Sequence, residues 1–216
     1  RGPPGTRIDV NLAAARLTYW RDGKIADTRK VVVGEPDTET PQLASPIYRL
    51  VANPTWTVPR SIQNKEIAGK GAGYMKRNNM VWKDGWIVQQ PGPKNSLGLV
   101  KFDMLNDHAI YLHDTPAKAL FGMVQRQRSH GCVRVDDALG FAEMLAKDEG
   151  VLDEWHKARE TGEENFVTLP HFTGLLTTLG VTENTPWQLP LLGSIFPYQF
   201  LGRKLVASGL VLFLTV

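Results

Sequence analysis

Residues 109–113 read Ala-Ile-Tyr-Leu-His and residues 129–134 read Ser-His-Gly-Cys-Val-Arg, with a loop between the two segments. The first segment has the composition of a strand, and we expect that strand to end at His113. After the second segment, apolar residues recur at helical spacing over residues 136–147, which predicts a helix. Cys132, the only cysteine of the chain, therefore lies between a predicted strand and a predicted helix.

The rest of the chain is dominated by strand patterns. Strands are predicted over residues 7–12, 16–20, 30–34, 47–51 and 98–105. The Asp22-Gly23 dipeptide, which follows the predicted strand 16–20, is a hairpin signal. Only one further short helix is predicted, over residues 152–160. The fold class indicated is mostly β, a sandwich or barrel-like body with a few helices.

Composition excludes several classes of protein. Apolar residues make up 42% of the 216 residues and charged residues 22%, which is typical of a globular chain and excludes wholesale disorder. A single cysteine excludes an internal disulfide and so a disulfide-rich scaffold. The net charge of +3 is too small to indicate nucleic-acid binding without a clustered basic patch.

Two segments differ from the predicted body. Residues 54–96 combine prolines, glycines, a run of basic residues and interleaved aromatic residues, which fits either a solvated loop with short helices or a lid over a site. Residues 171–216 are apolar and almost free of acidic residues. The uncharged stretch 205–216 is too short to cross a bilayer and fits a buried strand or helix better. We therefore predict a domain over residues 1–170 and a separate tail over 171–216.

Cys132 and two histidines carry the chemistry that the sequence suggests. A thiol is a weak nucleophile at neutral pH, and an imidazole such as that of His113 makes it reactive by taking its proton. Gly131 permits backbone angles that other residues avoid, so the amides of Gly131 and Cys132 are candidates for stabilising an oxyanion. The predicted helix after Cys132 would also favour the thiolate.

Other interpretations of the same residues stay open at this point. A lone cysteine is often a small buried apolar residue. His113, His130 and Cys132 together offer three ligands for zinc, although their spacing is not that of a zinc finger. Arg134 fits either a surface charge or a guanidinium that binds a substrate carboxylate.

The chain resembles the L,D-transpeptidases of the YkuD type. Members of that family have a histidine followed, after a spacer of similar length, by Ser/Thr-His-Gly-Cys, which here corresponds to His113 and residues 129–132. Further blocks that match in the same order are Val33-Gly34, Thr40-Pro41, Ser45-Pro46, Asn53-Pro54-Thr55-Trp56-Thr57-Val58-Pro59 and residues 91–98. The resemblance covers roughly residues 6–170, and the insertion at 54–96 is similar to the capping subdomain of larger Gram-negative members.

The resemblance implies roles for individual residues. Cys132 would be the nucleophile and His113 the general base, oriented by a main-chain carbonyl. Ser129, His130 and Gly131 would shape the site and lie near the oxyanion. The residues expected to bind substrate are Arg134, Tyr111 and Trp56. No metal and no cofactor is expected.

The resemblance also implies a reaction and a place in the cell. The enzyme would cleave the meso-diaminopimelate–D-Ala bond of a peptidoglycan tetrapeptide stem and transfer the acyl group to an amine, giving 3→3 cross-links. Carbapenems are expected to acylate Cys132, and the cell envelope or periplasm is the expected location. Other cell-wall synthesis proteins are possible partners, and no nucleic acid is expected.

Two alternatives within this reading concern the acceptor and the tail. With water as acceptor, the same site would be that of a thiol L,D-carboxypeptidase. From Phe172 onward the sequence does not resemble the strand that closes the sheet in this family. If the divergent tail breaks the fold, the chain would be a catalytically dead module that binds peptidoglycan.

Overall fold

A computed structural model describes residues 5–178 of the chain. Its main element is a nine-stranded mixed sheet with the strand order β10-β3-β11-β9-β8-β4-β12-β1-β2. The strands are β1 (Arg7–Asn11), β2 (Arg16–Arg21), β3 (Lys24–Gly34), β4 (Ala44–Ala52), β8 (Val100–Met104), β9 (Leu112–His113), β10 (Gln127–Ser129), β11 (Val133–Val135) and β12 (Asn165–Thr178). Strand β2 also pairs with β3, so the sheet closes on itself. The predicted mostly β, barrel-like fold is confirmed.

The long strand β3 makes this closure possible, because its two halves have different neighbours. Its first half pairs with β2 and its second half with β11 and β10. The turn between β2 and β3 is formed by Asp22 and Gly23, which both have positive φ, as the hairpin signal predicts. Side chains that alternate inward along the strands, such as Ile8 and Val10, fill the core of the barrel.

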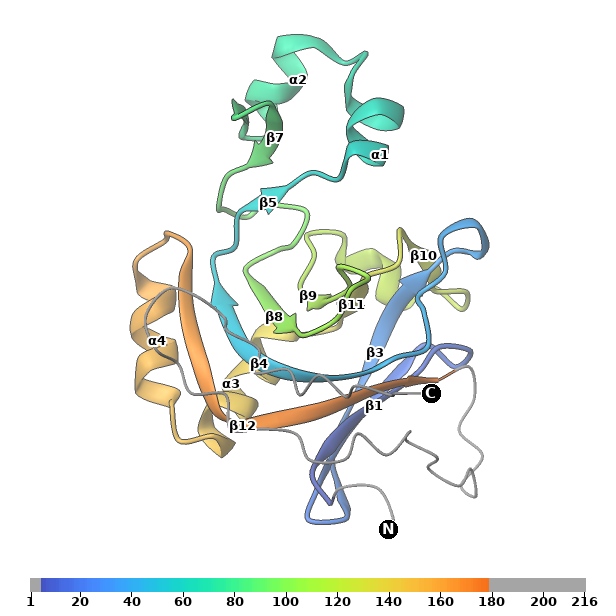
Figure 1. Ribbon diagram of the computed structural model, residues 1–216, viewed down its shortest axis with the longest axis vertical. Helices are drawn as coiled ribbons and strands as arrows, with labels where there is room; N and C mark the ends of the chain where they lie inside the picture. The colour runs from blue at the N-terminus through green and yellow to red at the C-terminus, as the bar shows by residue number, and fades with distance from the viewer. Residues whose placement is uncertain (1–4, 179–216) are drawn as a thin grey trace, which may run out of the picture. The chain divides into compact units, whose positions relative to one another are not determined.

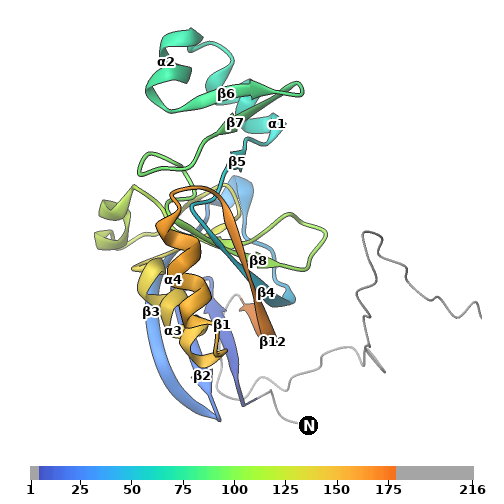
Figure 2. The same ribbon diagram turned by 90° about the vertical axis from the view of Figure 1, so that its left-hand side faces the viewer.

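Two helices pack beside the sheet, as Figures 1 and 2 show for α3 and α4. Helix α3 (Ala138–Asp148) and helix α4 (Leu152–Glu160) bury Phe141 and Trp155 completely in the main apolar cluster. The Asp137 side chain accepts a hydrogen bond from the Gly140 amide and so caps α3. Short 3₁₀ turns, η1 (Pro36–Thr38) and η3 (Lys118–Gly122), lie in the connections.

The predicted domain boundary at residue 170 is wrong, because strand β12 runs across it. The strand continues to residue 178, where it pairs with β1 on one side and with β4 on the other. Thr173, Leu175 and Thr177 are buried on one face of it. Residues 171–178 therefore complete the sheet and are no separate tail. The predictions for residues 179–216 lie outside the described part of the chain.

Residues 54–96 form a small substructure of their own. They contain a second sheet, with the order β5-β7-β6, and three short helical segments. These elements are β5 (Trp56–Thr57), α1 (Arg60–Ile62), the π-helical turn η2 (Gln63–Ile67), α2 (Gly71–Arg77), β6 (Met80–Lys83) and β7 (Trp86–Gln89). Val58, Ile67, Met80 and Ile87 form a separate apolar cluster inside it. We call residues 54–96 the insertion.

Buried Asn95 joins the two ends of the insertion. Its side-chain amide donates to the carbonyl of Pro54 at 2.9 Å and to that of Gln90 at 3.0 Å. The insertion therefore leaves and re-enters the body through a fixed base. Among residues 5–178, none of the helices has both the length and the apolar composition needed to cross a membrane.

Candidate active site

The register of three neighbouring strands sets the backbones of Cys132 and His113 close together, but among residues 5–178 the Cys132 sulfur contacts the Ala109 carbonyl and makes no hydrogen bond to the His113 ring. Strands β9 and β11 run parallel, and Arg134 pairs with His113. On the other side of β9, His113 pairs with Lys101 of β8. Because side chains two residues apart emerge on the same face, Tyr111 lies on the face of His113 and Cys132 on the face of Arg134. The pairing of β9 with β11 thus brings the two ends of the loop between His113 and Cys132 close together.

The segment before Cys132 is held by a small set of hydrogen bonds. The Ser129 hydroxyl donates to the carbonyl of Cys132 at 2.6 Å and accepts from the Gly131 amide at 3.2 Å. The hydroxyl of Thr40 donates to the Gly131 carbonyl at 2.7 Å and accepts from the amide of Gly34 at 2.9 Å. Thr40 thereby fixes this segment to the end of β3. We call residues 129–132 the catalytic loop, after the role proposed for Cys132 below.

The backbone conformation at position 131, with φ at +111°, favours glycine. A Cβ at this position would lie 3.2 Å from Cδ1 of Ile110, so both conformation and space favour glycine. In this structure the Gly131 amide donates to the Ser129 hydroxyl, and its oxyanion role stays a prediction. Within residues 5–178, the amide of Cys132 has no acceptor and remains available to an oxyanion.

His113 is buried and has a fixed orientation. Its Nδ1 lies within hydrogen-bond distance of the Asp114 carbonyl oxygen. A carbonyl oxygen only accepts, so Nδ1 carries the proton and Nε2 of a neutral ring is left as the proton acceptor. Burial and the positive charge of Arg134 lower the pKa of His113 to about 4. The His113 ring is therefore neutral at pH 7.

The Asp114 side chain has a structural role and does not contact His113 as a triad carboxylate would. One of its oxygens accepts from the Leu99 amide at 3.0 Å, and the other pairs with Lys118. Gly98 leaves the space for this carboxylate, because a Cβ there would lie 2.3 Å from it. Orientation of the imidazole thus comes from the main chain.

Cys132 is partly buried, and its sulfur lies 3.9 Å from the carbonyl oxygen of Ala109. Burial raises the pKa of the thiol, while Tyr111, Arg134 and Lys101 act in the opposite direction without cancelling it. The resting form is therefore the thiol, in contrast to the thiolate that the sequence suggested. The helix argument for a thiolate is wrong because strand β11 separates Cys132 from α3.

Tyr111 connects Cys132 to the insertion. Burial, and then the proximity of Cys132, raise the pKa of the Tyr111 phenol, so its hydroxyl stays protonated. The same hydroxyl interacts with the side chain of Trp56, at the start of the insertion. The Tyr111 ring packs edge-on against His113, with 5.8 Å between ring centroids. Tyr111 thus lies beside Cys132 and Trp56 beside Tyr111, while the substrate-binding role of both stays a prediction.

Two cations flank the thiol and the imidazole. Burial lowers the pKa of Arg134, and its Nε is buried without a hydrogen-bond partner. Within residues 5–178, no carboxylate forms an ion pair with Arg134. Lys101 lies 5.2 Å from the Tyr111 ring centroid and pairs with Asp103 at 2.8 Å. Lys101 was not among the predicted site residues, although it lies in the predicted strand 98–105, just before the predicted strand that ends at His113.

Comparison with known proteins identifies the family of this chain. The model of the YkuD L,D-transpeptidase catalytic domain matches residues 5–154. The chain belongs to the YkuD family. A candidate L,D-transpeptidase of Haemophilus influenzae is 31% identical to it over 176 residues, which is 71% of this chain and 35% of that protein. The chain thus spans about a third of the length of that relative.

Solved structures related to this YkuD domain share little sequence with it. The catalytic domain of an Enterococcus faecium L,D-transpeptidase, acylated by ertapenem, is 17% identical, with a TM-score of 0.45 over 82% of this chain and 100% of that one. L,D-transpeptidase 3 of Mycobacterium tuberculosis is 12% identical, with a TM-score of 0.44 over 81% of this chain and 61% of that one.

His130 points away from a possible metal site in this YkuD domain. Its Nε2 lies 2.9 Å from Oε1 of Glu66 in the insertion, and both side chains are about half exposed. Within residues 5–178, no group of three or more histidine, cysteine or acidic side chains is arranged to hold a metal ion. The three residues considered as zinc ligands, His113, His130 and Cys132, therefore do not converge.

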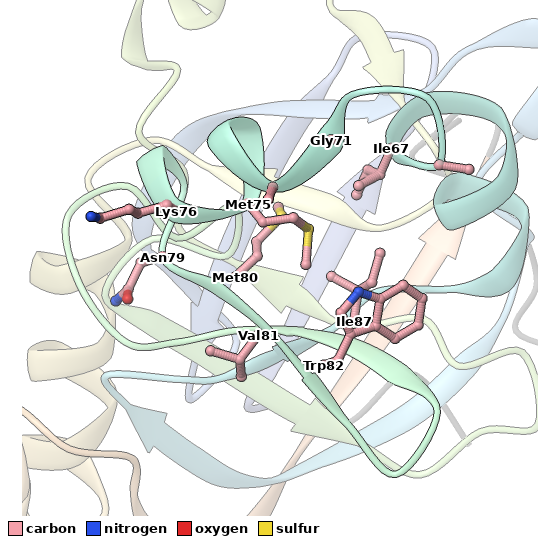
Figure 3. Close-up of a pocket in the computed structure, with 11 residues that line it drawn as sticks. Ile67, Gly71, Met75, Lys76, Asn79, Met80, Val81, Trp82 and Ile87 are labelled. Carbon is pink, nitrogen blue, oxygen red and sulfur yellow. The ribbon is translucent and has the colours of Figure 1, made fainter.

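The insertion of the YkuD domain also contains a cavity of about 530 Å³. Figure 3 shows Met75, Met80, Ile87 and Trp82 around it, with Lys76 at its edge. The residues that line the cavity all belong to residues 67–87, and Cys132 and His113 are not among them. The cavity is therefore a feature of the insertion and not of the candidate active site.

Proposed function

We propose that this domain is a peptidoglycan L,D-transpeptidase in which Cys132 is the nucleophile and His113 the general base. The observation that carries the proposal is the strand register that sets Cys132 and Arg134 beside Tyr111 and His113. The donor would be a tetrapeptide stem, cleaved between meso-diaminopimelate and D-Ala. The product would be a 3→3 cross-link between two stems.

The first half-reaction starts from the neutral pair. As the Cys132 sulfur attacks the carbonyl carbon of the diaminopimelate L-centre, Nε2 of His113 accepts the thiol proton. The carbonyl oxygen becomes an oxyanion, for which the Cys132 amide is the available donor. The C–N bond to D-Ala then breaks, and the His113 imidazolium gives its proton to the departing amine. A thioester and free D-Ala result.

The second half-reaction reverses the roles of the groups. The side-chain amine of a second stem attacks the thioester carbon and gives a proton to His113. The C–S bond breaks, and the proton returns to the Cys132 sulfur. A new amide bond joins the two stems, and the enzyme is restored with a neutral histidine and a thiol.

The cations at the site suit an anionic peptide. Stem peptides carry free carboxylates, and the unpaired guanidinium of Arg134 beside Cys132 offers a bidentate donor for one of them. Lys101 adds a second positive charge on the neighbouring strand. Tyr111 and Trp56 would contact the donor on the side of the insertion. We propose the cell envelope as the location, where this substrate is found.

Product analysis with a purified tetrapeptide stem tests the proposal. The expected product is a cross-linked dimer together with released D-Ala, and Cys132→Ala should abolish it while the variant still binds the stem. Free tripeptide without any dimer would instead identify an L,D-carboxypeptidase that uses water as acceptor. Binding of the stem with no turnover by the unmodified chain would identify a non-catalytic module. Full activity of Cys132→Ala would refute both enzymatic readings.

A further inference from the structure

The insertion meets the candidate active site at two places. Glu66 lies 2.9 Å from His130, which is two residues before Cys132. Trp56 interacts with the hydroxyl of Tyr111, which in turn interacts with Cys132. One contact therefore ends two residues before Cys132 and the other at Tyr111, which interacts with Cys132, although Glu66 and Trp56 lie in different elements of the insertion.

Glu66 is held in place by its neighbours in η2. Ile67 is buried in the apolar cluster of the insertion. Gln63 is also buried, and its side-chain amide donates to the Val58 carbonyl at 2.8 Å. The turn is thus fixed on its inner side. Glu66, whose side chain is 47% exposed, is left to reach the catalytic loop.

On the other side of the contact, the backbone around His130 is also held in place. It lies between Ser129, which is buried, and Gly131, whose carbonyl is bound by Thr40. The His130 ring donates from Nε2 to the Glu66 carboxylate whether the ring is charged or neutral, and the negative charge of the carboxylate makes this hydrogen bond stronger than one to a neutral amide oxygen. The pair therefore connects two rigid segments, the turn η2 and the catalytic loop.

We propose that Glu66 is a positioning residue that, through His130, holds the insertion against the catalytic loop while the donor stem is bound. The inference rests on the transpeptidase function proposed above. Ion pairs between half-exposed groups shift an equilibrium by only about two- to fivefold. Such a contact is strong enough to favour one position of the insertion and weak enough to break when a peptide enters or leaves.

Steady-state kinetics test the functional part of the inference. Glu66→Gln should raise KM for a tetrapeptide donor by about two- to fivefold and leave kcat within about twofold, because the chemistry at Cys132 is untouched. Asp84→Asn is the matched control, since Asp84 is the only other acidic residue of the insertion and is exposed. This control should leave both constants unchanged.

Hydrogen exchange followed by mass spectrometry tests the contact without relying on turnover. Glu66→Gln should raise exchange in residues 60–67 and in the catalytic loop, and Asp84→Asn should not. Unchanged exchange in Glu66→Gln, or the same change in both variants, would overturn the contact. Raised exchange with an unchanged KM would overturn the positioning role. If the unmodified chain shows no turnover, the transpeptidase proposal fails while the exchange result still decides on the contact.

Discussion

Arg134 and His113 face each other at the same position of the parallel pair β11 and β9. Burial of the imidazole and the positive charge of Arg134 together lower the pKa of His113 to about 4. The arrangement keeps the imidazole neutral over the physiological range. It also sets the charge of Arg134 near Cys132, where the proposed reaction would bind a peptide carboxylate.

The pH dependence of catalysis should reflect this pair. We expect kcat/KM for a tetrapeptide donor to fall as the pH drops through about 4, well below the ordinary histidine value of 6.5, because protonation removes the base. Arg134→Gln should move this acidic limb to higher pH by about one unit or less, whatever it does to the maximum rate. An acidic limb near 6.5 in the unmodified chain would contradict the neutral-base account.

Stability should depend on pH through the same residue. The pKa of His113 is lower in the folded than in the unfolded chain, so its stabilising contribution is complete above about 6.5 and is lost as the pH falls towards 4. The loss amounts to about 3 kcal/mol in the free energy of unfolding. Urea titrations of His113→Gln should lack this component between pH 7 and pH 4. Identical pH profiles of the two proteins would count against it.

Removing the phenol hydroxyl at Tyr111 should make the thiol less reactive. Burial raises the pKa of Cys132, and the Tyr111 hydroxyl partly offsets that effect. Tyr111→Phe should therefore slow alkylation of Cys132 by iodoacetamide at pH 8 by about three- to tenfold. Tyr19→Phe, which removes a hydroxyl that donates to Asp148 of α3 at 3.0 Å, serves as the control. An unchanged or faster rate in Tyr111→Phe would show that the hydroxyl does not act on the sulfur.

Gly131 should not tolerate a side chain. Alanine at φ +111°, with Cδ1 of Ile110 only 3.2 Å from the new Cβ, should cost about 1–3 kcal/mol of stability or displace Cys132. Thermal unfolding and the rate of Cys132 alkylation together detect either result. Gly69→Ala is the control, because no atom lies within 4 Å of a Cβ there. Equal behaviour of the two variants would refute the argument.

Much of the barrel could be predicted because its strands and its hairpin turn leave recognisable patterns within a few neighbouring residues. Alternation along β1 and the Asp22-Gly23 turn between β2 and β3 are visible in a few residues. Strand β12 could not be assigned beyond residue 170 in this way, since its second half is defined by pairing with β1 and β4. Distant neighbours decide such a strand, and the family resemblance is weakest there.

The sequence indicated candidate site residues but not their chemical state. The spacing of His113 and Cys132 and the resemblance of the surrounding segments indicated which residues to examine. The sequence did not reveal how deeply the thiol and the imidazole are buried, and burial is what makes both neutral. The contact between Glu66 and His130 was also missed, because nothing in a single sequence marks two residues 64 positions apart as neighbours.

The central claim, that Cys132 is an acylating nucleophile, is tested most directly by mass spectrometry after incubation with a carbapenem. We expect one covalent adduct per chain, mapped by peptide digestion to the segment that contains Cys132, and no adduct in Cys132→Ala. A chain that is folded by circular dichroism but acquires no adduct, or carries the adduct on another residue, would contradict the account.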